Sequence, residues 1–308
     1  MTVRLAVEAW APEYGSSMGS MGDPGAGSPA STANVDVNVE VDARDWTPRT
    51  PSGDAAEDVL FIDGVQRVDA QVWITDDDGT RLGHAASYAA GTVRCDGHAG
   101  VEACEVRRSL IAPAGAPTLV TRAATYAPAA VAADDPDALR SGLQERRRKL
   151  EIAVANAGAA ADLVVVDGPL SGRAELPNAI GYVKTHHVTY LPPLLADVVP
   201  QLGPGQRTPL FLTQTQFSRY AWYLRLPHGA GHPWAGVVRG EASGDVPLDE
   251  AVRLADLSAA TLPRFASQPH KDGRAPQNLY PIAGLERHLK RMLGDPSFLY
   301  RQLRAAVA

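Results

Sequence analysis

The sequence of 308 residues predicts one continuous α/β domain with a β-rich lobe. Three observations predict this class. Strand-like segments follow one another from residue 58, a long helical segment covers 137–161, and a continuous β-branched run begins at residue 162. Because strands and helices alternate along the chain without an internal repeat, we expect them to share one core.

Residues 1–57 are expected to form an N-terminal β extension ahead of the main domain, 58–308. Residues 15–34 are rich in Gly, Ser and Pro and cannot bury enough apolar surface to offset their ordering entropy, which predicts a disordered loop. The segments on either side, 3–10 and 34–46, alternate apolar with polar residues. This period of two predicts half-buried strands.

The main domain begins with three predicted antiparallel strands, 58–63, 68–74 and 81–95, which are apolar or alternating and are separated by turn residues. In 137–161, leucines recur among charged residues at helical intervals, which predicts a helix. The run 162–170 is apolar without alternation, as is typical of a strand buried on both faces.

The rest of the chain is expected to add strands and then helices. The predicted strands are 181–191, 208–214, 220–226 and 234–242, and the predicted helices are 248–266, 280–293 and 296–307.

Charge is distributed unevenly over a chain whose net charge is −6. Residues 1–60 contain ten acids against three arginines, whereas residues 262–308 contain eight bases against three acids. A basic groove that contacts phosphates would give this asymmetry, and so would a solvated helical face.

The expected location is the cytoplasm. No apolar run is long enough to cross a membrane, and the N-terminus lacks the pattern of a signal peptide. The two cysteines, Cys95 and Cys104, are interpreted as ordinary thiols of a reducing compartment.

Two of the apolar runs end in Asp-Gly, at Asp63 and at Asp167. If the two strands are neighbours, both carboxylates lie at one edge of the sheet, where they suit Mg²⁺ or Mn²⁺. Asp-Gly is also a common turn dipeptide, so a purely structural turn is the alternative.

A third carboxylate is expected from helix 137–161, which contains Glu145 and Glu151. Six positions apart, the two point in different directions, so one of them is expected to face the site. We favour Glu151, which lies between two apolar residues, over Glu145, which lies in a charged stretch.

Four short motifs together resemble the NurA nuclease family. They are FIDG at 61–64, VVVDGPL at 164–170, YVKTHHVTYL at 182–191 and YPIAGLERH at 280–288. The resemblance covers the chain from about residue 58 to its end. It implies a ribonuclease H-like mixed-sheet core with flanking helices.

The resemblance also implies roles for particular residues. Asp63, Asp167 and the helical glutamate, Glu151 or Glu145, would bind Mn²⁺ or Mg²⁺. His288 would bind the metal or donate a proton to the leaving oxygen, and Tyr280 would hydrogen-bond a ligand or the phosphate. Lys184 is interpreted as a phosphate contact.

The family resemblance implies a DNA nuclease that acts as a 5′→3′ exonuclease and a single-strand endonuclease in double-strand-break repair. It also implies a homodimer, DNA ends and single strands as partners, and a HerA-like hexameric ATPase. The chain has no phosphate-binding GxxxxGK[ST] motif, so ATP hydrolysis would belong to that partner. The alternatives are a catalytically weak or inactive DNA-end adaptor and a hydrolase of small phosphoesters.

Overall fold

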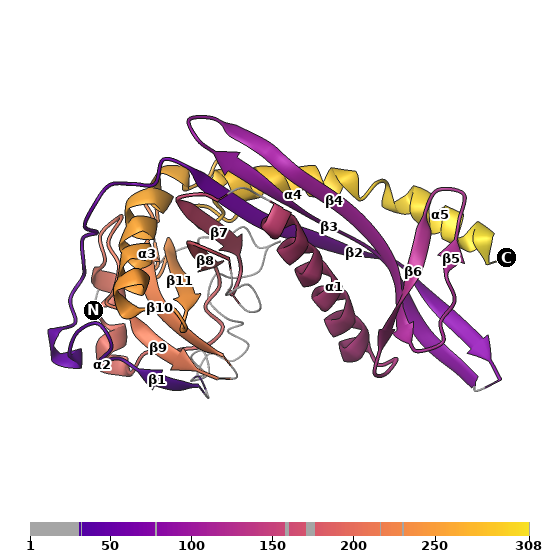
Figure 1. The fold of residues 1–308 in the computed structure, drawn as a ribbon, viewed down its shortest axis with the longest axis horizontal. Coiled ribbons are helices and arrows are strands. Elements are labelled where there is room, and N and C mark those ends of the chain that lie inside the picture. Colours follow the sequence, from indigo (N-terminus) through magenta and orange to yellow (C-terminus); the bar gives the residue numbers. More distant parts are fainter. Residues whose placement is uncertain are drawn as a thin grey trace, which may run out of the picture. The chain divides into compact units, whose positions relative to one another are not determined.

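The computed structural model describes residues 31, 33–77, 79–157, 160–170, 176–215, 217–229 and 231–307. Helices and strands alternate in it, so the predicted mixed α/β class is confirmed (Figure 1). The chain divides into two compact units. Unit 1 comprises the described residues up to Phe61 with Arg94–Ala99 and Ala160–Ala283, and unit 2 comprises Ile62–Val93, Gly100–Ala159 and Gly284–Ala308.

Long strands form most of unit 2. In sheet order they are β2 (Val59–Asp76), β3 (Gly79–Cys95), β4 (Ala99–Pro113), β6 (Thr125–Val131) and β5 (Leu119–Val120). Strands β2 and β3 are joined by two residues, a length that fits a hairpin. Strands β4 and β6 are parallel, so the sheet is mixed.

Helices cover both faces of this sheet, as Figure 1 shows. Leucines and a valine of α1 (Pro136–Ala157) pack against Ala86 and Ala90 of β3. The adjacent Ala85 points to the other face and packs with Leu303 of α5 (Pro296–Ala306). The small side chains of β3 therefore allow helices to approach from both sides.

Unit 1 contains a second set of strands. Their order is β1 (Asn34–Asp36), β9 (Phe211–Gln214), β10 (Ser218–Arg225), β11 (Val237–Ser243), β8 (Ala179–Val183) and β7 (Leu163–Asp167). Strands β7 and β8 are parallel, whereas β8, β11, β10, β9 and β1 pair antiparallel.

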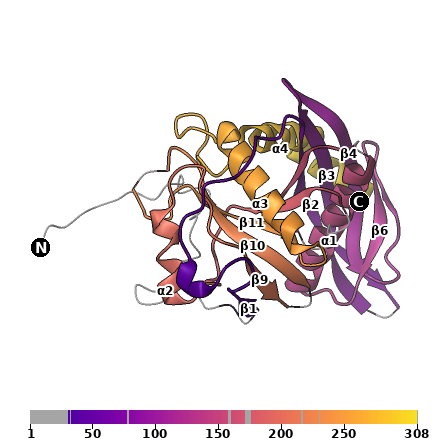
Figure 2. The same cartoon turned by 60° about the vertical axis from the view of Figure 1, so that its left-hand side comes forward.

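Helix α3 (Leu248–Thr261) packs on strands β10 and β11, which Figure 2 shows behind it. Trp222 is fully buried and donates a hydrogen bond to Ser258 Oγ at 3.1 Å. Its neighbour Tyr223 belongs to a core cluster that includes Val199 of the short 3-10 helix η3 (Val199–Gln201), which follows α2 (Pro193–Ala196). These aromatic residues are therefore core residues.

Strand β7 also neighbours the beginning of β2, within unit 1. The carbonyl oxygen of Asp58, just before β2, accepts hydrogen bonds from the backbone N–H groups of Asp162 at 3.1 Å and Leu163 at 3.3 Å. Both strands therefore start from one hydrogen-bonded point.

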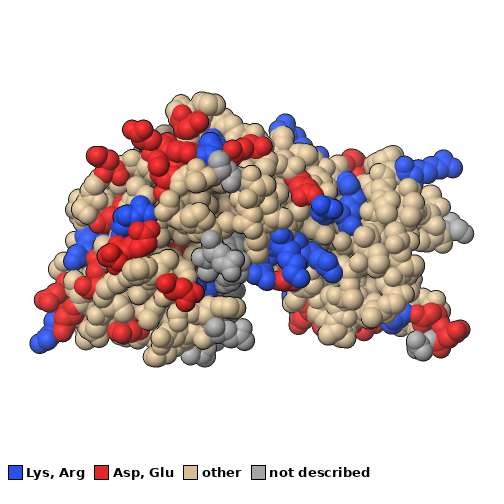
Figure 3. Space-filling model, in the orientation of Figure 1, with Lys and Arg blue, Asp and Glu red and all other residues tan. Residues whose placement is uncertain are grey.

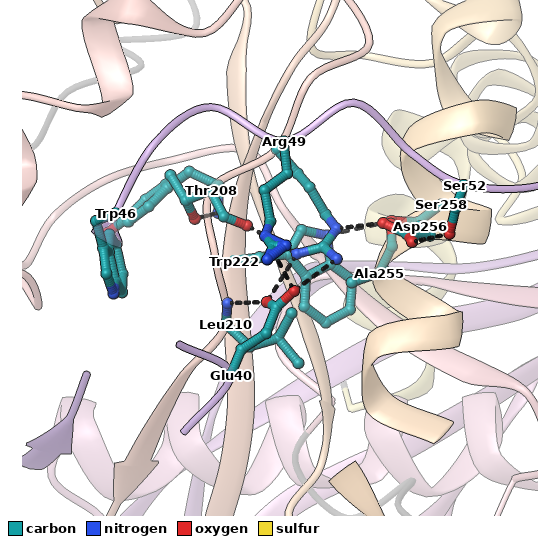
Figure 4. A network of polar contacts seen from close by, with 12 residues as sticks. Glu40, Trp46, Arg49, Ser52, Thr208, Leu210, Trp222, Ala255, Asp256 and Ser258 are labelled. Atoms are coloured by element: carbon teal, nitrogen blue, oxygen red, sulfur yellow. Dashed lines mark hydrogen bonds and ion pairs between the residues drawn. The ribbon is translucent and has the colours of Figure 1, made fainter. Parts of the chain in front are cut away.

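Within unit 1, a buried arginine joins the segment around Glu40 to helix α3; Figure 4 labels its partners Glu40 and Asp256. Arg207 is 1% exposed and donates to both carboxylate oxygens of Glu40, at 2.9 and 3.0 Å. Its Nε donates to Asp256 of α3 at 2.6 Å. Arg49 also pairs with Glu40, at 3.2 Å. Two buried carboxylates thus neutralise the guanidinium and join the segment to α3.

Several predicted elements have different bounds in the structure. The strand predicted at 34–46 ends at Asp36, whose side chain accepts the N–H of Asn38. A 3-10 helix, η2 (Ala43–Asp45), follows, and Asp42 caps it by accepting from the N–H of Arg44. The strands predicted at 58–63 and 68–74 are one strand, β2, so Asp63 lies within a strand and not at its end as predicted. The strand predicted at 181–191 ends at Val183.

Other differences concern the helices and the N-terminus. Helix 137–161 ends at Ala157, and helix 248–266 is α3 followed by the 3-10 helix η4 (Leu262–Phe265). Helix α4 (Tyr280–Met292) is close to its predicted span. The predicted strand 3–10 and nearly all of the predicted loop 15–34 lie outside the described residues.

Candidate functional site

In unit 2, Glu151 of helix α1 lies against Gly64, the residue that follows Asp63 in strand β2. Asp63, on β2, is 6% exposed, and its Oδ1 accepts the N–H of Gly64 at 2.7 Å. Glu151, on α1, is 1% exposed. A Cβ on Gly64 would lie 2.9 Å from Cγ and 3.0 Å from Cδ of Glu151, and closer still to Oε1. The glycine of this Asp-Gly pair therefore makes room for the Glu151 carboxylate.

Arg147 joins these two elements. Its Nη1 donates to Glu151 Oε1 at 2.5 Å and to the Gly64 carbonyl oxygen at 3.2 Å. Its Nε donates to Gln66 Oε1 at 3.2 Å. One guanidinium thus contacts the carboxylate from α1 and two acceptors on β2.

Glu145 is in a different environment. Its side chain is 41% exposed and pairs with Arg148 at 2.6 Å and Lys149 at 3.5 Å. Partial burial would raise the pKa of Glu145, but the hydrogen bonds and charges of Arg148 and Lys149 outweigh it and lower this pKa. Of the two helical glutamates, the structure brings Glu151 to the Asp63-Gly64 segment and leaves Glu145 at the surface.

Asp167 ends strand β7 in unit 1 and is held by Lys184. The Lys184 Nζ donates to Asp167 Oδ2 at 2.8 Å and to Asn278 Oδ1 at 3.2 Å. The Lys184 and Asp167 side chains are 12% and 17% exposed. Among the described residues, the buried Oδ1 of Asp167 has no hydrogen-bond partner.

Further polar residues surround this pair. Asn278 is fully buried, and its Nδ2 donates to Asp272 Oδ2 at 2.8 Å. Tyr182 lies beside Asp167, and its hydroxyl donates to the Gln277 carbonyl oxygen at 2.7 Å. Complete burial and then the charge of Asp167 raise the pKa of Tyr182 well above its usual value. Tyr182 therefore stays protonated and serves as a donor.

Tyr280 and His288 both lie on helix α4, eight residues apart. Residues at this spacing lie on the same side of a helix. The Lys271 Nζ lies 5.6 Å from the centre of the Tyr280 ring, and the buried Tyr280 hydroxyl has no hydrogen-bond partner within the described part of the chain. His288 is half-buried.

The comparisons with known proteins can be set against this geometry. A family model, the NurA domain, matches residues 57–290. The chain belongs to the NurA family. The family predicted from the sequence motifs is thus confirmed. Among solved structures, the crystal structure of the NurA nuclease from Sulfolobus solfataricus is similar, with 11% sequence identity, a TM-score of 0.46, and coverage of 82% of this chain and 86% of that chain. No curated protein matches this chain.

The NurA match encloses all the residues predicted as site residues from the sequence. These are Asp63, Glu145 or Glu151, Asp167, Lys184, Tyr280 and His288. Asp63, Glu151 and His288 belong to unit 2, and Asp167, Lys184 and Tyr280 belong to unit 1.

The carboxylates of this NurA protein are chemically suited to a hard divalent cation. Mg²⁺ and Mn²⁺ prefer carboxylate oxygens, which Asp63, Glu151 and Asp167 provide. The buried Oδ1 of Asp167, which no described residue satisfies, is the kind of oxygen that takes an ion. Within the described residues, no three His, Cys, Asp or Glu side chains are grouped as ligands of a single ion.

Two polar residues of the site were not predicted from the sequence. Arg147 lies four positions before Glu151, a spacing that places oppositely charged side chains together on a helix and could have identified it. Asn278 contacts Lys184 although the two are 94 positions apart in the sequence, which no local pattern reveals.

Among the described helices, none is long and apolar enough to cross a membrane.

Proposed function

We propose that this NurA-family protein is a DNA nuclease that depends on Mn²⁺ or Mg²⁺. The observation that carries the proposal is the buried carboxylate of Glu151 packed onto Gly64, directly beside Asp63. Burying a carboxylate is costly unless it is paired or binds a cation. Arg147 already pairs with Glu151, so burial alone does not require an ion; the two buried carboxylates are the hard oxygen donors that Mn²⁺ or Mg²⁺ prefers.

Asp167 is proposed as the third carboxylate. Its buried Oδ1, which no described residue satisfies, would be available to a cation. When bound, the ion would activate water and stabilise charge on the phosphate.

The other site residues are proposed to handle the DNA. Lys184, held by Asn278 at Asp167, would donate a hydrogen bond to a phosphate oxygen. His288 would act as a metal ligand or give a proton to the leaving oxygen, and the Tyr280 hydroxyl would donate to the phosphate. Lys and Arg side chains gather on the face drawn in Figure 3 and would contact the DNA backbone.

The family resemblance supports further proposals about the reaction. We propose 5′→3′ exonuclease and single-strand endonuclease activity in end resection, by a homodimer that works with a HerA-like hexameric ATPase. Sedimentation of the pure protein tests the dimer. Faster degradation of DNA ends when the ATPase and ATP are added tests the partnership.

The central test compares isosteric variants of the carboxylates on linear DNA with Mn²⁺. Asp63→Asn, Glu151→Gln and Asp167→Asn are each expected to lower cleavage by more than about a hundredfold, because each removes a charged metal ligand. Glu145→Gln is the matched control on the same helix and is expected to cleave like the wild type.

Binding and melting measurements accompany this test. Without metal, Asp63→Asn is expected to melt no lower than the wild type, because the amide isostere replaces a buried charge. A wild-type protein that binds DNA ends but does not cut them with Mn²⁺ or Mg²⁺ would instead be a DNA-end adaptor.

A further inference from the structure

Helix α1 carries four consecutive basic residues, Arg146–Lys149, whose surroundings differ. Arg148 and Lys149 pair with the exposed Glu145. Arg147 has a side chain that is 28% exposed and donates to three acceptors, one of them on the buried Glu151. Arg147 thus contacts the neighbouring strand, whereas Arg148 and Lys149 pair with Glu145 of their own helix.

The position of Glu151 is tightly constrained. Its carboxylate occupies the space where a Cβ on Gly64 would lie, so the glycine lets it approach β2 closely. Its Oε1 accepts from Arg147 at 2.5 Å, and the same Nη1 also donates to the Gly64 carbonyl oxygen. The guanidinium therefore ties the carboxylate to the backbone of the residue that follows Asp63.

The geometry of the guanidinium is suited to this task. Arginine presents five donors in a rigid planar fork, whereas lysine has a single charged nitrogen on a flexible stem. Nη1 and Nε of Arg147 serve acceptors on two elements at once, Glu151 on α1 and Gly64 with Gln66 on β2. A lysine at this position would keep the charge but lose part of these contacts.

We propose that Arg147 is a positioning residue of the proposed nuclease, which sets where the Glu151 carboxylate stands relative to Asp63 by tying it to Gly64 and Gln66. This inference rests on the proposed function. Arg147 acts through Glu151 and is not itself a metal ligand. Residues that orient metal ligands in this way change metal affinity or activity by about ten- to a hundredfold when they are replaced.

The test compares Arg147→Gln and Arg147→Lys with Arg140→Gln, which breaks an exposed pair with Asp137 on the same helix. Mn²⁺ binding to the full chain is measured directly by titration calorimetry, and kcat and KM are measured on linear DNA. Both Arg147 variants are expected to bind Mn²⁺ about ten- to a hundredfold more weakly and to lose kcat to a similar extent, with KM for DNA little changed. Arg140→Gln is expected to match the wild type.

The outcomes separate the inference from the proposed function. If the wild type binds Mn²⁺ and cuts DNA but the Arg147 variants bind Mn²⁺ equally well, the inference is wrong and the nuclease stands. If the wild type neither binds Mn²⁺ nor cuts, both are wrong. Should Arg147→Gln fail to fold, Arg147→Lys decides, because it retains the charge. Lower melting with unchanged Mn²⁺ affinity in that variant would indicate a merely structural role and overturn the inference.

Discussion

The two glycines of the Asp-Gly pairs are required for different physical reasons. Gly64 is needed for space, because a Cβ there would collide with Glu151. Gly168 has open space around it but a φ of 95°, a conformation that side chains other than glycine rarely adopt. The same dipeptide thus supports a close approach in one strand and a left-handed turn in the other.

This difference predicts how alanine affects stability at the two positions. Gly64→Ala is expected to lower the free energy of unfolding by about 1–3 kcal/mol through overpacking against Glu151. In a Glu151→Ala background the same change should cost little, because the obstructing carboxylate is gone. Gly168→Ala should cost about 1–3 kcal/mol through backbone strain in either background. Urea unfolding of the five variants measures this coupling, and equal costs for Gly64→Ala with and without Glu151 would contradict the explanation.

At the level of single residues, part of the candidate site follows from the sequence. The apolar neighbours of Glu151 favoured it over Glu145, and the structure buries Glu151 and exposes Glu145. Arg147 was not predicted, because within a run of four basic residues every side chain looks solvated. Its distinct environment comes from tertiary contacts with β2.

At the level of elements, the end of helix α4 is fastened by arginines from the sheet of unit 2. Arg67 of β2 donates to the carbonyl oxygens of Gly294 at 2.9 Å and Leu293 at 3.3 Å, and to Asp69 at 2.8 Å. Arg108 of β4 donates to Leu293 O at 3.1 Å. The last carbonyls of a helix lack partners within the helix, so these hydrogen bonds satisfy them. Positive charge at this end also interacts favourably with the negative end of the helix dipole.

Arg67→Gln is therefore expected to lower the free energy of unfolding by about 2–3 kcal/mol, since charged hydrogen bonds to the helix end and to the buried Asp69 are lost. Arg107→Gln provides the control, because its side chain is 61% exposed and pairs with Glu105. That variant should change stability by less than about 0.5 kcal/mol. Chemical denaturation compares them, and a similar loss in both would show that the contacts of Arg67 contribute little.

Elements with clear periodicity were predicted well, and those with mixed patterns were not. The β-branched run of β7 and the amphipathic helices α3, α4 and α5 lie close to their predicted positions. Strand β4 was missed, because charged residues interrupt its first half and its apolar part is short. The strand predicted to continue beyond Val183 ends there. The next side chain, that of Lys184, forms an ion pair with Asp167.

At the scale of the whole molecule, one buried histidine links stability to pH. His186 is 3% exposed, lies beside Tyr223 and Trp234, and contacts the Val237 carbonyl oxygen at 3.0 Å. Burial lowers the pKa of His186 from 6.5 to about 4. The folded state therefore holds a neutral imidazole, whereas the unfolded chain takes up a proton below pH 6.5.

The resulting contribution to stability is complete above pH 6.5 and is lost progressively as the pH falls toward about 4. Its full size is on the order of 3 kcal/mol. His186→Gln retains a donor for Val237 and does not titrate, so its unfolding free energy should fall less steeply between these pH values. Urea unfolding at pH 7, 6, 5 and 4.5 measures both slopes, and identical slopes would exclude His186 as the cause.

The mixed α/β class and the family were predictable from the sequence, whereas the division into two units was not. Each unit combines segments that are far apart in the sequence, and strands β2, β3 and β4 contribute residues to both units. Local sequence patterns predict which residues are buried. They do not predict which distant segments of the chain pack together in one unit.

The salt bridge between Glu40 and Arg207 bears on where this protein can be shortened. The family model begins at residue 57, so a fragment trimmed to that boundary would omit Glu40 and Arg49. Arg207 would keep its ion pair with Asp256 but lose both hydrogen bonds to Glu40. A fragment that starts before Glu40 is therefore the better choice for retaining this buried contact.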